Sequence, residues 1–199
     1  MSYSIDASTD SCYEGTTCLI NKLGIRDEKQ LDIVESHISL AKISLLQKNP
    51  LQGNFDFEHY KAIHKFLFED LYDWAGTVRK VNISKKGTSF AKVDEIENMA
   101  KACFDRLKKC NFFKDYEFMD FVDEITDFYC VTNSLHPFRE GNGRAPRVFL
   151  AQLSENAGYE MNFADADVDK LMMATIHAAN GVNTYLKETL REIIKPIKK

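Results

Sequence analysis

Apolar residues recur at steps of three and four over most of the chain, the spacing of one face of an α-helix. The first such stretch follows Asp27, a residue type that caps helix starts, and contains Leu31, Val34, Ile38, Ala41 and Leu45. A second helix is expected after Asp56 and is expected to end near residues 74–76, where Gly76 can adopt the left-handed conformation. The same periodicity predicts further helices over residues 93–109, 115–134, 143–157, 166–178 and 182–194.

One segment between the helices has a different pattern. Residues 78–83 alternate in polarity and are β-branched, residues 84–87 have the composition of a turn, and residues 88–91 follow as a second short strand. This predicts a β-hairpin. The expected fold class is therefore all-α, a helical bundle with one short β-hairpin.

Composition limits the domain organisation and the partners. A length of 199 residues suits one compact domain, and the polar start of the chain predicts a flexible N-terminal arm over residues 1–18 before a single domain over residues 19–199. The net charge of −4 argues against direct nucleic-acid binding, and no apolar run is long enough to span a membrane. Five cysteines without a CxxC pair, and the lack of a signal sequence, fit a reduced cytoplasmic setting.

Residues 136–147, with the sequence HPFREGNGRAPR, carry the candidate chemistry. Pro146 is tolerated only in the first turn of a helix, so a new helix is expected to begin near Gly143. Gly141 and Gly143 allow a close main-chain turn whose N–H groups converge at the positive end of that helix. Arg144 and Arg147 are three residues apart and share one helical face. Such a cluster of donors and positive charges suits a polyphosphate.

Two further groups complete a reaction site in this segment. Glu140 offers a hard oxygen ligand for Mg²⁺, which commonly binds one carboxylate together with substrate phosphates. His136 titrates near neutral pH and can accept a proton from an attacking hydroxyl. Although these two residues are four apart, Pro137 and Gly141 break any helix between them, so a zinc hydrolase is not favoured. The other histidines are interpreted as packing or surface residues: His37, His59, His64 and His177.

The segment resembles the signature of the Fic family, HxFx(D/E)GNGRxxR, at every specified position. Residues 71–76, Arg79, and residues 82–85 and 90–91 are also similar to the end of the helix before the family's hairpin and to the hairpin itself, called the flap. The resemblance covers roughly residues 19–194.

This resemblance implies a Mg²⁺-dependent protein adenylyltransferase, which moves AMP from ATP to a hydroxyl side chain of a target protein and releases pyrophosphate. By this resemblance, His136 would be the general base, Phe138 would anchor the loop in the core, and Glu140 would hold Mg²⁺. The residues that would bind the nucleotide are Arg139, Gly141, Asn142, Gly143, Arg144 and Arg147. The flap residues that would bind the target are Lys85, Lys86 and Gly87.

Two other functions stay open from the sequence. A phosphotransferase branch of the family departs from the signature at the second glycine, whereas Gly143 is intact here. An inactive nucleotide-binding module that serves protein interaction is the other alternative, although His136 and Glu140 are both present.

The resemblance also bears on regulation and partners. Many Fic proteins carry an inhibitory glutamate in an (S/T)xxxE(G/N) helix, which pairs with the second arginine of the signature, here Arg147. The one near match, Thr184 to Glu188, is followed by Thr189 and is interpreted as structural. The sequence therefore predicts inhibition in trans by a small antitoxin that supplies the glutamate, as in toxin–antitoxin pairs. The expected target is a protein with an exposed Tyr, Thr or Ser, and a type II topoisomerase is one candidate by analogy.

Overall fold

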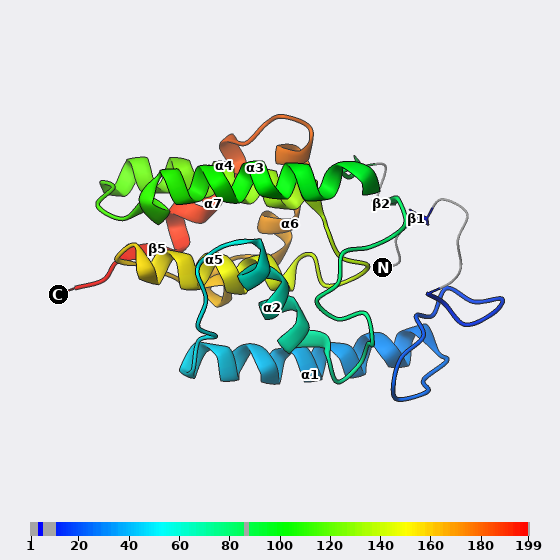
Figure 1. The fold of residues 1–199 in the computed structure, drawn as a ribbon. Coiled ribbons are helices and arrows are strands. Elements are labelled where there is room, and N and C mark those ends of the chain that lie inside the picture. Colours follow the sequence, from blue (N-terminus) through cyan, green and yellow to red (C-terminus); the bar gives the residue numbers. More distant parts are fainter. Residues whose placement is uncertain (1–3, 6–10, 86–87, 199) are drawn as a thin grey trace.

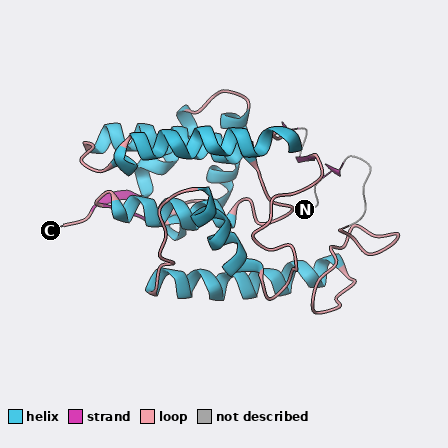
Figure 2. Cartoon of the chain, in the orientation of Figure 1, coloured by secondary structure: helices cyan, strands magenta, loops and turns pink. Residues whose placement is uncertain are grey.

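The computed structural model of the protein describes residues 4–5, 11–85 and 88–198 (Figure 1). Helices dominate these residues, as Figure 2 shows, which confirms the predicted all-α class. The helices are α1 (Glu28–Lys48), α2 (Phe57–Phe68), α3 (Ile96–Lys109), α4 (Phe118–Leu135), α5 (Arg144–Asn156), α6 (Val168–Ala179) and α7 (Thr184–Ile193). Three 3₁₀ turns accompany them, at Val93–Glu95, Asn111–Phe113 and Phe163–Asp165.

The helices pack in layers with α5 in the middle. In Figure 1, α3 and α4 lie along one side, α1 lies along the opposite side, and α2 and α5 lie between them. Helices α6 and α7 pack against each other and against α4. The loop that joins α4 to α5 holds residues 136–143, so two buried helices fix both of its ends.

Aspartate caps explain where several helices begin. The Asp27 carboxylate accepts a hydrogen bond from the Gln30 N–H at 2.7 Å, and Asp56 accepts one from the His59 N–H at 2.8 Å. Each bond satisfies an N–H group that has no partner within its helix, which typically stabilises a helix by about 1 kcal/mol. Both starts agree with the sequence prediction.

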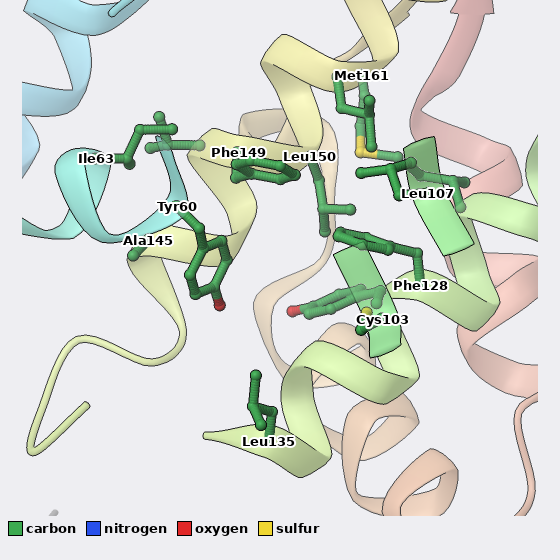
Figure 3. Close-up of a cluster of buried hydrophobic side chains, with 14 of the residues drawn as sticks. Tyr60, Ile63, Cys103, Leu107, Phe128, Leu135, Ala145, Phe149, Leu150 and Met161 are labelled. Carbon is green, nitrogen blue, oxygen red and sulfur yellow. The ribbon is translucent and has the colours of Figure 1, made fainter. Parts of the chain in front are cut away.

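Aromatic side chains fill the core around α5. Phe149 lies 5.4 Å from Tyr60 on α2 and 5.8 Å from Phe128 on α4, measured between ring centroids (Figure 3). Phe138 is completely buried and stacks on Tyr60 at 5.6 Å. The predicted role of Phe138 as the anchor of the loop is therefore confirmed.

The strands are shorter than the sequence suggests. Strand β2 (Ile83–Lys85) pairs with β3 (Thr88–Ser89) as the expected hairpin, and β1 (Ser4–Ile5) adds antiparallel to the other edge of β2. The segment from residue 78 to 82 was predicted as strand but forms a bend instead, because its main chain bonds to the loop after α4.

Two elements differ from the sequence prediction. A second antiparallel pair, β4 (Tyr159–Met161) with β5 (Ile194–Pro196), was not predicted, because its partners are far apart in the chain. Helix α2 ends at Phe68 rather than near residues 74–76. The chain continues in tight turns there, which bury Leu71 and Tyr72, and Gly76 closes these turns with a φ of +80°.

Residues 11–19 contact the rest of the fold. Cys12 and Leu19 form an antiparallel bridge, and Cys12 and Cys18 are both buried as free thiols. The division into an arm over residues 1–18 and a domain over residues 19–199 stays a prediction. No helix in the described ranges is long and apolar enough to cross a bilayer.

Candidate active site

The loop after α4 turns sharply at two residues with positive φ. His136 ends α4 with a φ of +42° and a ψ of +58°, a left-handed conformation that is uncommon for a residue with a side chain. Gly141 has a φ of +83°, and a Cβ atom there would lie only 2.3 Å from the Phe68 ring. The chain can therefore make this turn only with glycine at position 141, as the sequence predicts.

Nδ1 of the His136 imidazole is committed to the protein. Its Nδ1 lies 2.8 Å from the main-chain oxygen of Asn133, and because that oxygen can only accept, Nδ1–H is the donor. The ring also stacks on Phe90, with 3.6 Å between centroids and 8° between planes. Burial, together with the nearby cations Lys85 and Arg79, lowers the pKa of His136 to about 3. The imidazole is thus neutral near pH 7, with its lone pair on Nε2.

Asn142 closes the loop from inside. Its Oδ1 accepts from the Phe138 N–H at 2.9 Å, and its Nδ2 donates to the Phe138 carbonyl at 2.7 Å. The side chain is almost fully buried. Its amide therefore holds the loop in shape, and its part in nucleotide binding stays a prediction.

His64 supports the same loop from α2. Its Nδ1 accepts from the Gly76 N–H at 2.9 Å, so the other nitrogen, Nε2, carries a hydrogen and donates to the Glu140 carbonyl at 2.9 Å. The ring stacks on Phe138 at 3.7 Å. Burial lowers the pKa of His64 to about 3, which keeps this neutral tautomer. The sequence indicated a packing or surface role for His64 and gave no signal for this contact, which spans 76 residues.

Glu140 lies at the edge of a cleft with its carboxylate partly committed. Its Oε1 accepts from the Gly141 N–H at 2.9 Å and lies 3.7 Å from Nη2 of Arg144. Burial raises the pKa of Glu140, and the neighbouring Glu35 carboxylate raises it further. A cation bound here would offset both effects.

Arg144 is held by α1. Its Nη2 forms an ion pair with Oε1 of Glu35, and its Nη1 donates to the Ser39 hydroxyl at 2.9 Å. The other Glu35 oxygen accepts from the Tyr72 hydroxyl, so Glu35 is fixed on both sides. Glu35 is buried and 109 residues from Arg144 in sequence, and nothing in the amphipathic pattern of α1 sets it apart.

The cleft beside Arg144 has a volume of about 520 Å³ and is open to solvent. It is lined by α1, the loop and the flap, through Asp32, Glu35, Ser39, Lys85, Glu140 and Arg144. Charges of both signs meet there. The structure thus brings three of the predicted site residues together: Lys85, Glu140 and Arg144.

Arg147 contrasts with Arg144. Its guanidinium lies over the Phe163 ring, 5.9 Å from the centroid, and its Nε is buried without a hydrogen-bond partner in the described part of the chain. Gly143, just before α5, has an ordinary φ of −97°, and a Cβ atom there would meet nothing within 4 Å. Packing therefore does not require glycine at position 143, and the space beside it is open.

The remaining predicted residues lie elsewhere or outside the description. The Arg139 guanidinium is buried and donates to the Ser11 hydroxyl at 2.9 Å and to the Cys12 sulfur at 3.6 Å. Its predicted role in nucleotide binding stays a prediction. Lys86 and Gly87, the predicted tip of the flap, lie outside the described residues.

A solvent-open cleft lined by Glu140 and Arg144, at the start of a buried helix and in the loop that also carries the neutral imidazole of His136, defines a site suited to reactions of nucleotide polyphosphates. The model of the Fic/DOC family matches residues 54–154. The chain belongs to the Fic/DOC family.

Relatives and solved structures agree with this family. Protein adenylyltransferase VbhT of Bartonella schoenbuchensis is 34% identical over 176 residues, which cover 88% of this chain and 37% of that protein. This chain thus spans about a third of VbhT. "Probable protein adenylyltransferase y4lH" of Sinorhizobium fredii is 33% identical, over 92% of this chain and 94% of that protein.

The fold of a Bartonella tribocorum effector, BepC with bound AMPPNP, superposes with a TM-score of 0.89 and 28% identity, over 94% of this chain and 97% of that one. A Fic domain of Bartonella quintana with bound ADP also reaches a TM-score of 0.89, at 25% identity, over 94% of this chain and 95% of that one.

Proposed function

We propose that this chain is a protein adenylyltransferase, which transfers AMP from ATP to a hydroxyl side chain of a target protein. The observation that carries the proposal is the arrangement of residues 136–147. The neutral imidazole of His136 lies at one end, and at the other end the Nε of Arg147 is buried without a hydrogen-bond partner among the described residues. The names of VbhT and y4lH, and the nucleotides bound to the related Bartonella structures, support the same activity.

The reaction follows from these groups. The target hydroxyl oxygen attacks the α-phosphorus of ATP, its proton passes to Nε2 of His136, and the bond from the α-phosphorus to the bridging oxygen breaks to release pyrophosphate. His136 is suited to this step because its tautomer is set by Asn133 and because burial keeps it neutral. Most of the rate comes from positioning and charge stabilisation.

The proposed phosphate contacts come from Arg147, Arg144 and the main chain beside Gly143. Arg147 offers its unsatisfied Nε to a phosphate, and the open side of Gly143 lets a phosphate approach the main chain. Arg144 presents the donors that Glu35 and Ser39 do not occupy. Gly141 and Asn142 contribute the shape of the loop.

Mg²⁺ fits Glu140 as a ligand. No group of three or more possible metal ligands exists among the described residues, so a metal held by protein side chains alone is not what this cleft offers. One partly buried carboxylate whose pKa is raised suits an ion that shares its coordination with phosphates. When bound, Mg²⁺ neutralises phosphate charge.

The flap is the proposed contact for the target, through Lys85, Lys86 and Gly87. An extended target segment with an exposed Tyr, Thr or Ser would add to the flap as a strand. Because β1 lies on one edge of β2, this segment would either replace β1 or pair with the outer edge of β3. A type II topoisomerase remains a candidate target by analogy.

Inhibition in trans also belongs to the proposal. No carboxylate pairs with Arg147 in the described part of the chain, and Glu188 is exposed on α7. A small antitoxin could supply a glutamate to Arg147, where it would compete with a phosphate for the same donors.

Labelled ATP tests the proposed function. The purified chain is incubated with bacterial lysate proteins and ATP labelled at the α- or the γ-phosphate, beside a His136→Ala variant. Label from α-ATP should appear on protein and fall by about 100-fold or more in the variant. Label from γ-ATP would instead indicate phosphoryl transfer. Unchanged labelling by His136→Ala, or no labelling by the wild type, would contradict the proposal.

A further inference from the structure

Arg79 joins the flap to the loop that carries His136. The side chain is 4% exposed, and its guanidinium donates to three main-chain carbonyls. Nε donates to His136 at 2.9 Å, Nη1 to Val81 at 2.7 Å, and Nη2 to Ala91. Val81 precedes the first strand of the flap and Ala91 follows the second, so one planar group holds both flap strands and the catalytic loop.

Two main-chain hydrogen bonds and a ring contact also join the flap to the end of α4 and the loop that follows it. The Arg79 N–H donates to the Pro137 carbonyl at 2.8 Å, and the Ala91 N–H donates to the Ser134 carbonyl at 3.0 Å. The Phe90 ring, at the end of the flap, stacks on the His136 imidazole at 3.6 Å. The base of the flap and the end of α4 therefore form one connected unit.

Arginine suits this position for a physical reason. The guanidinium is rigid and planar and carries five N–H donors in fixed directions, so three acceptors bound to it are also fixed relative to one another. A lysine has one ammonium group on a flexible stem and cannot hold three carbonyls at set angles. The side chain thus determines where the flap lies relative to Nε2 of His136.

We infer that Arg79 is a positioning residue that selects a protein hydroxyl, held by the flap, over water as the acceptor of AMP. The inference rests on the proposed function. A target hydroxyl reaches His136 only if the flap holds its main chain at the right place, and a misplacement of about 1 Å can reduce a rate about 100-fold. Water needs no flap. It attacks the same α-phosphorus, gives up its proton to His136, and yields free AMP and pyrophosphate.

The test compares two products from one nucleotide. The variants are Arg79→Gln, which is uncharged, and Arg79→Lys, which keeps the charge without the planar group. Lys80→Gln is the matched control, because Lys80 is the exposed neighbour in the same bend. With α-labelled ATP, label on bacterial lysate proteins and label in free AMP are measured, below the unfolding temperature of every variant.

The ratio of label on protein to label in free AMP tests the inference about Arg79. It should fall by about 10- to 100-fold in Arg79→Gln. It should fall less in Arg79→Lys and stay within about twofold of the wild type in Lys80→Gln. Binding of AMPPNP, measured by calorimetry, should change little in all three. An unchanged ratio, or an equal loss of both products together with AMPPNP binding, would overturn the inference.

Hydrogen exchange provides a readout that needs no target. In Arg79→Gln, amides of residues 81–85 and 88–91 should exchange faster, while those of α5 keep the wild-type rate. If the wild type labels no protein, the proposed function fails and the exchange still decides whether Arg79 positions the flap. Unchanged exchange in the flap, or faster exchange throughout the domain, would count against a positioning role.

Discussion

The two ends of the segment from His136 to Arg147 are held in different ways. At the first end, Asn133 fixes the imidazole of His136, Arg79 binds the carbonyl of His136, and Asn142 closes the loop. At the second end, the Nε of Arg147 is buried without a partner in the described residues. The first end is held by partners within the protein, and the second has a donor that the nucleotide would pair with in the proposed function.

In this arrangement the fold meets the free-energy cost of ordering the first end, and a bound ligand would offset the cost of the unpaired donor at the second end. Groups that must be aligned for proton transfer are fixed by the fold, so no ordering is needed when the substrate arrives. A buried donor without a partner costs about 1–3 kcal/mol, and a bound phosphate can recover that cost. The antitoxin proposed above would use the same unsatisfied group.

Substitutions of the two glycines of the loop should have the largest effects, a loss of stability at Gly141 and a loss of nucleotide binding at Gly143. Gly141→Ala forces a side chain into a φ of +83° and into the Phe68 ring, so the free energy of unfolding should fall by roughly 4 kcal/mol. Gly143→Ala meets nothing within 4 Å and should keep the wild-type stability within about 0.5 kcal/mol while weakening AMPPNP binding. Urea unfolding and calorimetry measure both. Equal destabilisation by the two variants would contradict the comparison.

The two arginines should differ in the same way, with the loss of stability at Arg144 and the loss of nucleotide binding at Arg147. Arg147→Met removes a buried donor that has no partner among the described residues, so the free energy of unfolding should rise by about 1–3 kcal/mol, while AMPPNP affinity falls about 10- to 100-fold with the lost phosphate contact. Arg144→Met leaves Glu35 buried without its cation, so the free energy of unfolding should fall by about 3 kcal/mol. The account is wrong if Arg147→Met destabilises the fold more than Arg144→Met does.

Acid should destabilise the fold through His64 and His136, the two histidines whose pKa is lowered most. The pKa values of His64 and His136 are both lowered to about 3, whereas the unfolded chain takes up these protons near pH 6.5. Stability is therefore complete above pH 6.5 and is lost as the pH falls toward 3. The two groups together should cost roughly 2–3 kcal/mol between pH 7 and pH 5.5.

Variants identify the source of this pH dependence. His64→Gln should remove about half of the slope of unfolding free energy against pH in that window. His177→Gln, at an exposed histidine on α6, should leave the slope unchanged. A slope that is unchanged in His64→Gln would mean that groups other than His64 cause the pH dependence.

Substitution of Glu35 should change nucleotide affinity by less than substitution of Arg147 does. Glu35→Gln keeps the shape of the side chain but removes the negative charge beside Arg144, so AMPPNP should bind about three- to tenfold more tightly. Glu124→Gln, which removes the half-buried partner of the exposed Arg106, is the control and should leave binding unchanged. Weaker binding by Glu35→Gln would show that Glu35 mainly orients Arg144 for the nucleotide.

Local features could be predicted from the sequence, and long-range partners could not. Asp27 and Asp56 cap helices where expected, and α5 begins beside Pro146 as the proline rule requires. The contact of His64 with Glu140 spans 76 residues and that of Glu35 with Arg144 spans 109, so no periodicity within one helix reveals either. Arg139 illustrates the same limit, because its partners are 127 and 128 residues away.

A crystal structure with AMPPNP and Mg²⁺ tests the central claim most directly. We expect a phosphate oxygen within hydrogen-bond distance of the Arg147 guanidinium, with His136 and Asn142 keeping their present partners at Asn133 and Phe138. A nucleotide that leaves Arg147 unpaired, or that binds only after His136 and Asn142 have changed partners, would contradict the account.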